Sequence, residues 1–215
     1  TNSGYKKDGI FKVVNLIDFS YGKIYVDSDP KKKKKDGSSW QNAYLYLQDA
    51  LRVPGPGARI HIAQGTYYSD QYSYNSFNTE ADKRTLNLID DITIAGGYGG
   101  LDSEDPNLQD PNIYNTYLTG SYYDELEGKK FDNNIIYASN VDDTVIEGVV
   151  ITGADAKSAV LLENGSNIKF ENCTFTENQE ESTGGAAVKC LYSNADFKNC
   201  KFYKNYSASN GAAII

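Results

Sequence analysis

Apolar and polar residues alternate in short segments along most of this chain. Such alternation, interrupted by turns rich in Gly, Asn and Asp, predicts many short β-strands that each bury one face. The alternating apolar positions include Ile24/Val26, Ile60/Ile62, Ile92/Ile94, Ile135/Tyr137, Val149/Ile151, Cys173/Phe175 and Val188/Cys190. A chain with this pattern folds as a sandwich, a barrel or a β-solenoid.

One segment has the period of a helix, and we predict an α-helix over about residues 38–52. Ser38 or Ser39 is the predicted N-cap, and apolar residues then recur at spacings of three and four on one face. These apolar residues are Trp40, Ala43, Tyr44, Leu47, Ala50 and Leu51. The segment Val53–Gly57 ends the helix, because proline cannot continue the hydrogen-bond ladder.

Internal repetition selects the solenoid among these folds. The segment Glu171–Asn178 recurs as Lys198–Asn205 about 27 residues later, and Gly184–Val188 recurs as Asn210–Ile214. Further upstream, Ile146 and then Ile94 take the place of Phe170. Repeats of this length that hold several strands each form one coil, and stacked coils share a core. We therefore predict an all-β, right-handed parallel β-helix with coils about 4.8 Å apart.

The repeat register also predicts a column of polar turn residues. Three positions before the aligned core residues stand Asp91, Asp143, Asn167 and Asn194. Asp and Asn tolerate the left-handed backbone and hydrogen-bond within their own turn. We expect these four residues to form a ladder along one corner of the solenoid.

Two repeated motifs resemble a known family. Phe175–Asn178 and Phe202–Asn205, followed by Gly184–Val188 and Asn210–Ile214, resemble the FxxN and GGA(I/V/L) repeats of chlamydial polymorphic outer membrane proteins. These motifs support the coil interpretation, since the family is built from such repeats.

An ordered series of motifs resembles the amino-terminal region of secreted bacterial right-handed β-helix proteins. The series consists of Gly37–Ala43, Leu47–Leu51, Ile60–Tyr67, Ile94–Tyr98, Thr116–Gly120 and Gly148–Gly153. The resemblance implies that the helix caps the start of the solenoid. It also implies an extracellular or cell-surface role in adhesion, display or structural assembly.

This resemblance divides the chain into two parts. Residues 1–22 are an N-terminal extension in which Ile10–Ile17 is a candidate extra strand, and residues 23–215 are the β-helix, with regular repeats over about 134–215. The run Lys31–Lys35 replaces a short Gly-rich loop of the family. Either solvation or binding to an anionic glycan or surface accounts for such a run.

The amino-acid composition excludes several classes of function. The 215 residues carry 21 basic and 29 acidic side chains and a net charge of −8. An acidic chain lacks the basic face that nucleic-acid binding requires, and no apolar run approaches the roughly 18 residues of a membrane helix. Only one histidine is present, so a His-rich metal site is excluded, and no cofactor is expected.

The two ends of the sequence predict a partner. The chain starts at Thr1 without a signal-peptide pattern, which indicates a mature product or an excised fragment. It stops at Gly211–Ile215, midway through a coil. An uncapped coil exposes strand edges that template pairing. We expect either further coils or self-association through this coil, with a head-to-tail filament as one form.

Cys173 and Cys200 occupy equivalent places in adjacent coils, where the coil spacing lies within the range of a disulfide. The alternative is a stack of free buried thiols, which parallel stacking favours. Cys190 is expected to be buried and unpaired.

Carboxylates supply the candidate chemistry. Asp91 and Asp143, in register, are weak candidates for calcium binding, with a solvated turn as the alternative. Several parallel β-helix enzymes cut acidic polysaccharides with clustered carboxylates and a basic residue, here Arg84 or Lys83. His61 is expected to point outward from its strand and to play no catalytic part.

Two surface features suggest that the protein carries or binds glycans. Sequons at Asn164, Asn172 and Asn205 are candidate N-glycosylation sites. The Tyr-rich segment Tyr67–Tyr74 is either a sugar-binding surface or a packing loop. The function expected from the sequence is therefore a secreted, non-catalytic structural or adhesive β-helix that contacts a glycan or a cell-surface receptor. A polysaccharide lyase or hydrolase, or a glycan-binding module, is the alternative.

Overall fold

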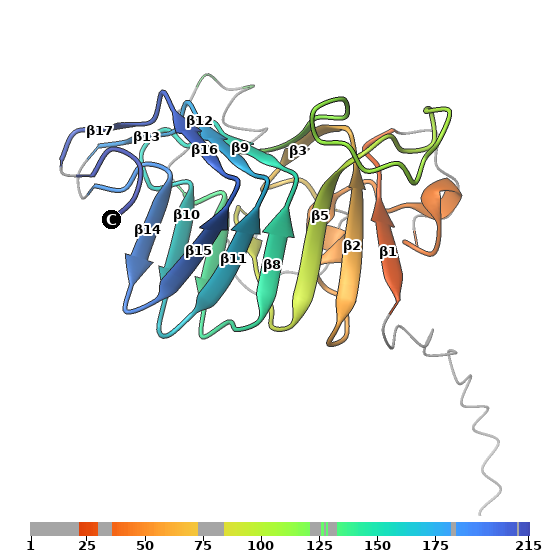
Figure 1. Cartoon of the computed structure of the whole chain (residues 1–215), viewed down its shortest axis with the longest axis horizontal. Helices are drawn as coiled ribbons and strands as arrows, with labels where there is room; N and C mark the ends of the chain where they lie inside the picture. The colour runs from red at the N-terminus through yellow and green to blue at the C-terminus, as the bar shows by residue number, and fades with distance from the viewer. Residues whose placement is uncertain are drawn as a thin grey trace, which may run out of the picture.

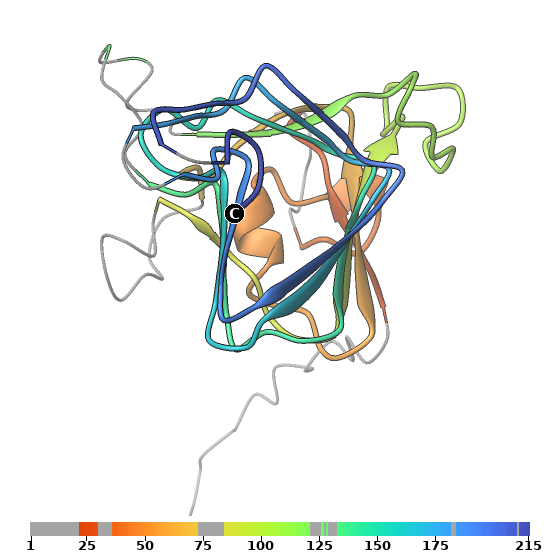
Figure 2. The ribbon, with the colours of Figure 1, turned by 60° about the vertical axis from the view of Figure 1, so that its left-hand side comes forward.

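The computed structural model describes residues 22–29, 36–72, 84–120, 126, 128, 133–181, 184–209 and 211–215. The candidate strand Ile10–Ile17, the run Lys31–Lys35 and Lys83 lie outside these residues. The described chain winds in stacked coils, and its strands all pair in parallel with strands of neighbouring coils. Figure 2 shows strands of successive coils superimposed around one interior. The predicted parallel β-helix is therefore confirmed.

Four sheets form the sides of the solenoid, and a typical coil passes through sheets A, B and C in turn. Sheet A contains β1 (Lys23–Val26), β2 (Ala58–Ala63), β5 (Ile92–Tyr98), β8 (Thr144–Glu147), β11 (Asn167–Glu171) and β15 (Asn194–Lys198). Sheet B contains β3 (Gly65–Tyr68), β6 (Thr116–Thr119), β9 (Val150–Thr152), β12 (Thr174–Thr176) and β16 (Lys201–Tyr203). Sheet C contains β4 (Leu86–Asn87), β7 (Ile136–Ser139), β10 (Val160–Glu163) and β14 (Val188–Leu191). A small fourth sheet pairs β13 (Gln179–Glu180) with β17 (Tyr206–Ser207).

The register follows the sequence repeats. Ile94 pairs with Ile146, Ile146 with Phe170, and Phe170 with Phe197. Strand pairing also sets Phe175 opposite Phe202, and their rings stack at 4.7 Å with an interplanar angle of 2°. Identical side chains one coil apart thus stack on one another, and the interior is a series of such columns.

The helical region is shorter than the predicted 38–52. A 3₁₀ turn, η1 (Trp40–Asn42), precedes the one-turn helix α1 (Leu47–Ala50). Between them the backbone of Tyr44 is extended alongside β1, since its N–H donates to the Tyr25 carbonyl at 2.8 Å. Because the backbone groups of Tyr44 bond to β1, they are not available for a continuous helix. The helix is therefore shorter than the spacing of apolar residues predicted.

The helix nevertheless caps the interior. Leu47, Ala50 and Leu51 are buried in the main core cluster together with Ile24 and Val26 of β1. Figure 2 shows α1 within the outline of the coils. Ser39 precedes η1 but makes no side-chain capping hydrogen bond, and Ser38 instead donates to the carboxylate of Asp36 at 2.6 Å.

The predicted Asp/Asn column follows the register, since Asn167 pairs with Asn194, but two of its four residues have the expected left-handed backbone and two do not. Asp91 and Asp143 have the left-handed backbone, with φ of 52° each. Asn167 and Asn194 instead begin strands β11 and β15. In those later coils the left-handed residues come earlier in the turn, at Asn164 and Tyr192 (φ of 57° and 53°).

A second, smaller cluster covers the outer side of sheet A. Trp40, Ala63, Ala95 and Tyr98 are buried there, with Tyr25 packed against them. His61 lies on this outer side, as predicted, with its ring centroid 4.5 Å from that of Tyr98. It is covered rather than solvated, however, with an exposed fraction of only 5%.

Candidate functional site

A groove runs along the solenoid where sheets A and B meet, and we call it the corner groove. Its volume is about 700 Å³. The lining residues come from successive coils: Pro111, Asn112, Asn115, Thr116, Gly148, Val149, Val150, Asn172, Cys173, Thr174, Asn199 and Lys201. The groove is thus elongated in the direction in which the coils stack.

The floor of the groove depends on a left-handed turn that recurs after three successive strands of sheet A, β8, β11 and β15. Gly148, Asn172 and Asn199 follow β8, β11 and β15, with φ of 64°, 52° and 53°. Glycine and asparagine are the residues that adopt this conformation most readily. The chain needs this corner to pass from sheet A to sheet B.

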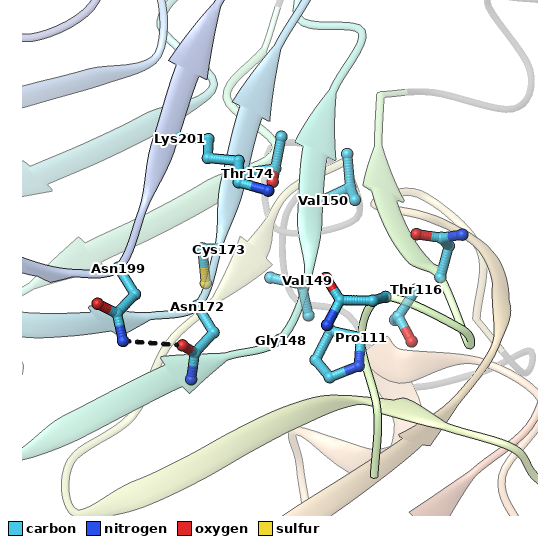
Figure 3. A pocket seen from close by; sticks show the side chains of 12 residues that line it. Pro111, Thr116, Gly148, Val149, Val150, Asn172, Cys173, Thr174, Asn199 and Lys201 are labelled. Atoms are coloured by element: carbon cyan, nitrogen blue, oxygen red, sulfur yellow. Dashed lines mark hydrogen bonds between the residues drawn. The ribbon is translucent and has the colours of Figure 1, made fainter.

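Asparagine at this corner also presents an amide to the groove. The Nδ2 of Asn199 donates to the Oδ1 of Asn172 at 3.2 Å, as Figure 3 shows. The Nδ2 group of Asn172 and the Oδ1 atom of Asn199 form the two ends of this short ladder. One end therefore offers hydrogen-bond donors and the other an acceptor.

The wall of the groove belongs to the segment 99–115, between β5 and β6. The N–H of Asp110 donates to the Gly97 carbonyl at 2.7 Å, directly beside Pro111. A Cβ on Gly148 would lie 2.9 Å from the Pro111 side chain. Glycine at 148 therefore lets the wall pack directly onto the corner.

A polar cluster attaches this wall to sheet A. The amide Nε2 of Gln109 donates to the Gly96 carbonyl at 3.1 Å and to Oε1 of Glu147 at 2.7 Å. Arg59 pairs with the same carboxylate. Because these contacts hold the wall against sheet A, the wall is a preformed part of the groove.

The chemistry of the groove is that of neutral hydrogen-bonding groups. Amides of Asn112, Asn115, Asn172 and Asn199 and hydroxyls of Thr116 and Thr174 surround it. Of the described residues that line it, Lys201 is the one charged side chain. Polar groups of this kind, spaced by a coil repeat of about 4.8 Å, match the repeated hydroxyls of an extended polysaccharide.

The candidate acidic pair lies elsewhere. Asp91 and Asp143 precede β5 and β8, at the edge of sheet A opposite the corner groove, and both are exposed. Arg84 precedes β4 in sheet C. The described residues contain no group of three or more His, Cys, Asp or Glu side chains placed to hold a metal ion. The fold therefore does not bring these residues to the groove.

The backbone of this acidic corner is well bonded. The N–H of Asp142 donates to Oδ1 of Asp90 at 2.9 Å, and Nδ2 of Asn167 donates to Oδ1 of Asp142 at 3.2 Å. These side-chain hydrogen bonds between coils come from the carboxylates of Asp90 and Asp142, whereas Asp91 bonds to Asp142 through its backbone N–H. Their role here is to support the turn.

The three sequons occupy different environments. Asn164 lies in an exposed turn, where its Nδ2 donates to the Ser139 hydroxyl at 2.8 Å. Asn172 lines the corner groove. Asn205 is half-buried, and its Nδ2 donates to the Phe175 carbonyl at 2.9 Å. Attachment of a glycan is therefore least hindered at Asn164.

All three cysteines are free thiols in the structure. Cys173 is buried, and burial raises its pKa, as it does for the half-buried Cys190. The hydrogen bond with the Cys173 thiol lowers the pKa of Cys200 to about 7. Cys173 and Cys200 thus differ in acidity although they occupy equivalent positions.

The Tyr-rich segment is in part a packing element. Tyr67 is 3% exposed, and its hydroxyl donates to the Ala63 carbonyl at 3.1 Å. Tyr68 is half-buried, and Ser73 and Tyr74 lie outside the described residues. Tyr67 therefore does not present its ring to a sugar.

The corner groove was not predicted from the sequence. Asn172 and Asn199 were visible as repeated residues, and their shared place after a strand of sheet A is a signal for a polar corner. Pro111 and Asn112 come from a segment outside the repeats, so nothing in the sequence indicates that they line the same groove as Asn172. Within the described part of the chain, no helix is long and apolar enough to cross a membrane.

Comparisons with known proteins bear on the fold. A family model described as a right-handed β-helix region matches residues 60–215. A search of curated proteins finds no match. Among solved structures, a rhamnogalacturonan lyase is similar with a TM-score of 0.43 and 13% identity. The similarity covers 90% of this chain but 60% of the lyase, so the chain spans less than two thirds of that protein.

Proposed function

Because this chain belongs to the right-handed β-helix family, we propose that it is an extracellular or cell-surface adhesive β-helix that binds an extended glycan in the corner groove. The glycan is bound without cleavage and without a cofactor. The family supplies a rigid repeated scaffold. The groove supplies the specific contacts on this scaffold, and the proposal rests on them.

The observation that carries the proposal is the repetition of polar groups along the groove. Asn172 and Asn199 stand one coil apart and are bonded to each other, while Thr174 and Lys201 form the next pair on sheet B. A polymer laid along the stacking direction meets an equivalent set of groups in two successive coils, those of Asn172 and Asn199. Asparagine amides bind sugar hydroxyls because they both donate and accept.

The chemistry of the lining favours binding over cleavage. Glycosidic bond hydrolysis needs a pair of carboxyl groups on either side of the scissile bond. No described lining residue of the groove carries a carboxylate, and Asp91 and Asp143 lie at the opposite edge of sheet A. A polysaccharide lyase or hydrolase remains the alternative proposal.

Binding assays with three variants test the proposal. Asn199→Gly removes the amide but keeps a residue suited to φ of 53°, and Lys201→Gln removes the charge. Asn164→Gly is the matched control, because Asn164 is also an exposed left-handed asparagine (φ of 57°) but lies away from the groove. We expect a polysaccharide panel to reveal a ligand whose affinity falls at least tenfold in the two groove variants and is unchanged in the control.

Two results would overturn the proposal. One is equal loss of affinity in all three variants, or in none. The other is the appearance of new reducing ends or unsaturated sugars during incubation with the ligand, which would establish the enzyme instead.

We also propose self-association through the face of the last coil, formed by β15, β16 and residues 211–215, which cover the edge of β14. This face exposes large apolar side chains, with Tyr203 at 50% and Ile214 at 40%. At the other end of sheet A, β1 is already paired, because the N–H of Tyr25 donates to the Gly37 carbonyl at 3.0 Å. A second copy is therefore better accommodated face to face than head to tail.

Sedimentation of the 215-residue chain tests this second proposal. We expect a concentration-dependent dimer that Tyr203→Lys weakens. Tyr117→Lys is the control, since Tyr117 is an exposed tyrosine of sheet B three strands away from β16. A monomer at all concentrations, or equal effects of both substitutions, would refute it.

A further inference from the structure

Two cysteines face each other across neighbouring coils. Strand pairing sets Glu171 opposite Lys198 and Thr174 opposite Lys201. Cys173 lies two residues after Glu171 and one before Thr174, and Cys200 lies in the same way between Lys198 and Lys201. Their backbones are therefore one coil apart, about 4.8 Å, which is within the Cα range of a disulfide.

The two thiols point in the same direction along the solenoid. The thiol of Cys200 donates to the Phe170 carbonyl at 3.3 Å, and Phe170 belongs to the coil of Cys173. The thiol of Cys173 donates to the Ile146 carbonyl at 3.4 Å, one coil further on. Cys200 is thus directed toward Cys173, and a rotation of the Cys173 side chain completes the approach.

The two thiols also differ in access and acidity. Cys173 is 1% exposed, whereas Cys200 is half-buried. The thiolate is the nucleophile in thiol–disulfide exchange, and a pKa near the ambient pH suits an attacking thiol. The lowered pKa of Cys200 and the raised pKa of Cys173 favour attack by Cys200.

We propose that Cys200 and Cys173 form a thiol–disulfide exchange site, at which a low-molecular-weight disulfide oxidises the pair to a disulfide between coils. The Cys200 thiolate attacks one sulfur of the external disulfide, forms a mixed disulfide and releases one thiolate. Cys173 then loses its proton to solvent and attacks the Cys200 sulfur, and the second external thiolate leaves. The protein loses two electrons, and the external disulfide is reduced to two thiols.

The reaction has a consequence for the corner groove, because Cys173 lies between Asn172 and Thr174, which both line it. A disulfide would tie the floor of the groove in two coils together. The exchange chemistry itself does not depend on glycan binding, so the two proposals fail independently.

Cys190 provides an internal control. It is half-buried like Cys200, but its stacking partner in β10 is Leu162 rather than a cysteine. Burial raises its pKa. We therefore expect Cys190 to react slowly and to form no bond within the chain.

The test treats the folded chain with oxidised glutathione and follows it by mass spectrometry. In the native chain we expect rapid loss of two thiols, no retained glutathione and a peptide linking Cys173 to Cys200. Cys173→Ala should trap a mixed disulfide on Cys200, while Cys190→Ser should behave as the native chain.

Three outcomes would overturn the proposal. These are a stable mixed disulfide on Cys200 in the native chain, a reaction no faster at Cys200 than at Cys190, and a crosslink that involves Cys190. Should Cys173→Ala not fold, rates of alkylation of the three thiols in the native chain decide the same question, since Cys200 must react first.

Discussion

The indole Nε1 of Trp40 donates a hydrogen bond of 3.0 Å to Oδ1 of Asn107, across 67 residues of sequence. This bond joins the segment that covers the outer side of sheet A to the wall of the corner groove. The wall is thus held by two neighbouring contacts, from Gln109 to Glu147 and from Asn107 to Trp40. Groove geometry and outer packing are therefore coupled.

Removing this bond is expected to affect both stability and binding. Trp40→Phe keeps an aromatic ring but removes the donor of this hydrogen bond, so the exposed Asn107 amide bonds only to water. We expect a loss of about 1 kcal/mol in the free energy of unfolding and weaker glycan binding. Urea unfolding followed by circular dichroism measures the first, and unchanged stability in both Trp40→Phe and Asn107→Ala would show that the bond is immaterial.

The pH dependence of stability is expected to follow His61. Burial, together with the positive charges of Arg59 and Lys23, lowers its pKa to about 4. Neither ring nitrogen has a hydrogen-bond partner in the described structure. The unfolded chain takes up a proton at His61 near pH 6.5, so between these values the unfolded state holds more protons. This contribution to stability is complete above pH 6.5 and is lost as the pH falls toward 4, by on the order of 2 kcal/mol.

The variant His61→Phe isolates this contribution. Phenylalanine keeps the ring contacts with Tyr25 and Tyr98 but does not titrate. Unfolding of both proteins at pH 7.5 and pH 4.5 should show a smaller acid loss in the variant. The intrinsic fluorescence of Trp40, the single tryptophan, reports on the same cluster. Equal acid losses in the two proteins would contradict the assignment.

The buried amide of Asn178 is expected to be a strong determinant of stability. Its Nδ2 donates to the Ile151 carbonyl at 3.0 Å, and its Oδ1 accepts from the N–H of Ala154 at 3.2 Å. Asn178→Leu leaves both backbone groups buried without partners, so we expect a loss of about 2–4 kcal/mol. Asn199→Leu is not a fair comparison, because leucine does not readily adopt the left-handed backbone of Asn199. Asn205→Ala should cost less, because Asn205, whose Oδ1 accepts from the Asn178 amide, is only half-buried. Equal losses would mean that burial does not set the cost.

Glycosylation in a secretory host is expected to differ among the three sequons. Asn164 should be occupied, because it is exposed in a turn, whereas Asn205 is half-buried and its Nδ2 donates to the Phe175 backbone carbonyl. Occupancy at Asn172 would place a glycan in the corner groove and abolish polysaccharide binding. Peptide mass spectrometry measures occupancy at each site, and full occupancy of Asn205 with little at Asn164 would contradict this order.

The sequence predicted the coils because their determinants are local and repeated. Phe175 and Phe202, or Ile94 and Ile146, occupy equivalent positions, so an alignment of the chain with itself already gives the strand register. The same reasoning placed Asp91 and Asp143 in a left-handed turn. It also placed Asn167 in register with Asn194, but both of these residues already belong to strands and so do not have the left-handed backbone.

The candidate site was harder to predict because it joins unlike parts of the chain. Pro111 meets Gly148 at the corner through a segment that has no counterpart in other coils. The length of the helix was likewise set by a tertiary contact, since Tyr44 pairs with β1. No periodicity or residue spacing in the sequence indicates such contacts.

The segment that forms the wall leaves the solenoid and returns without disturbing it. Ile92 and Thr144 contact each other across 52 residues, whereas the equivalent pairs in later coils, Thr144 with Ile168 and Ile168 with Ala195, are 24 and 27 residues apart. Because the entropic cost of a loop grows slowly with its length, the stack tolerates such an insertion. The wall can therefore change in length and sequence while the columns of the core are kept. The shape of the corner groove can therefore be altered without altering the scaffold that carries it.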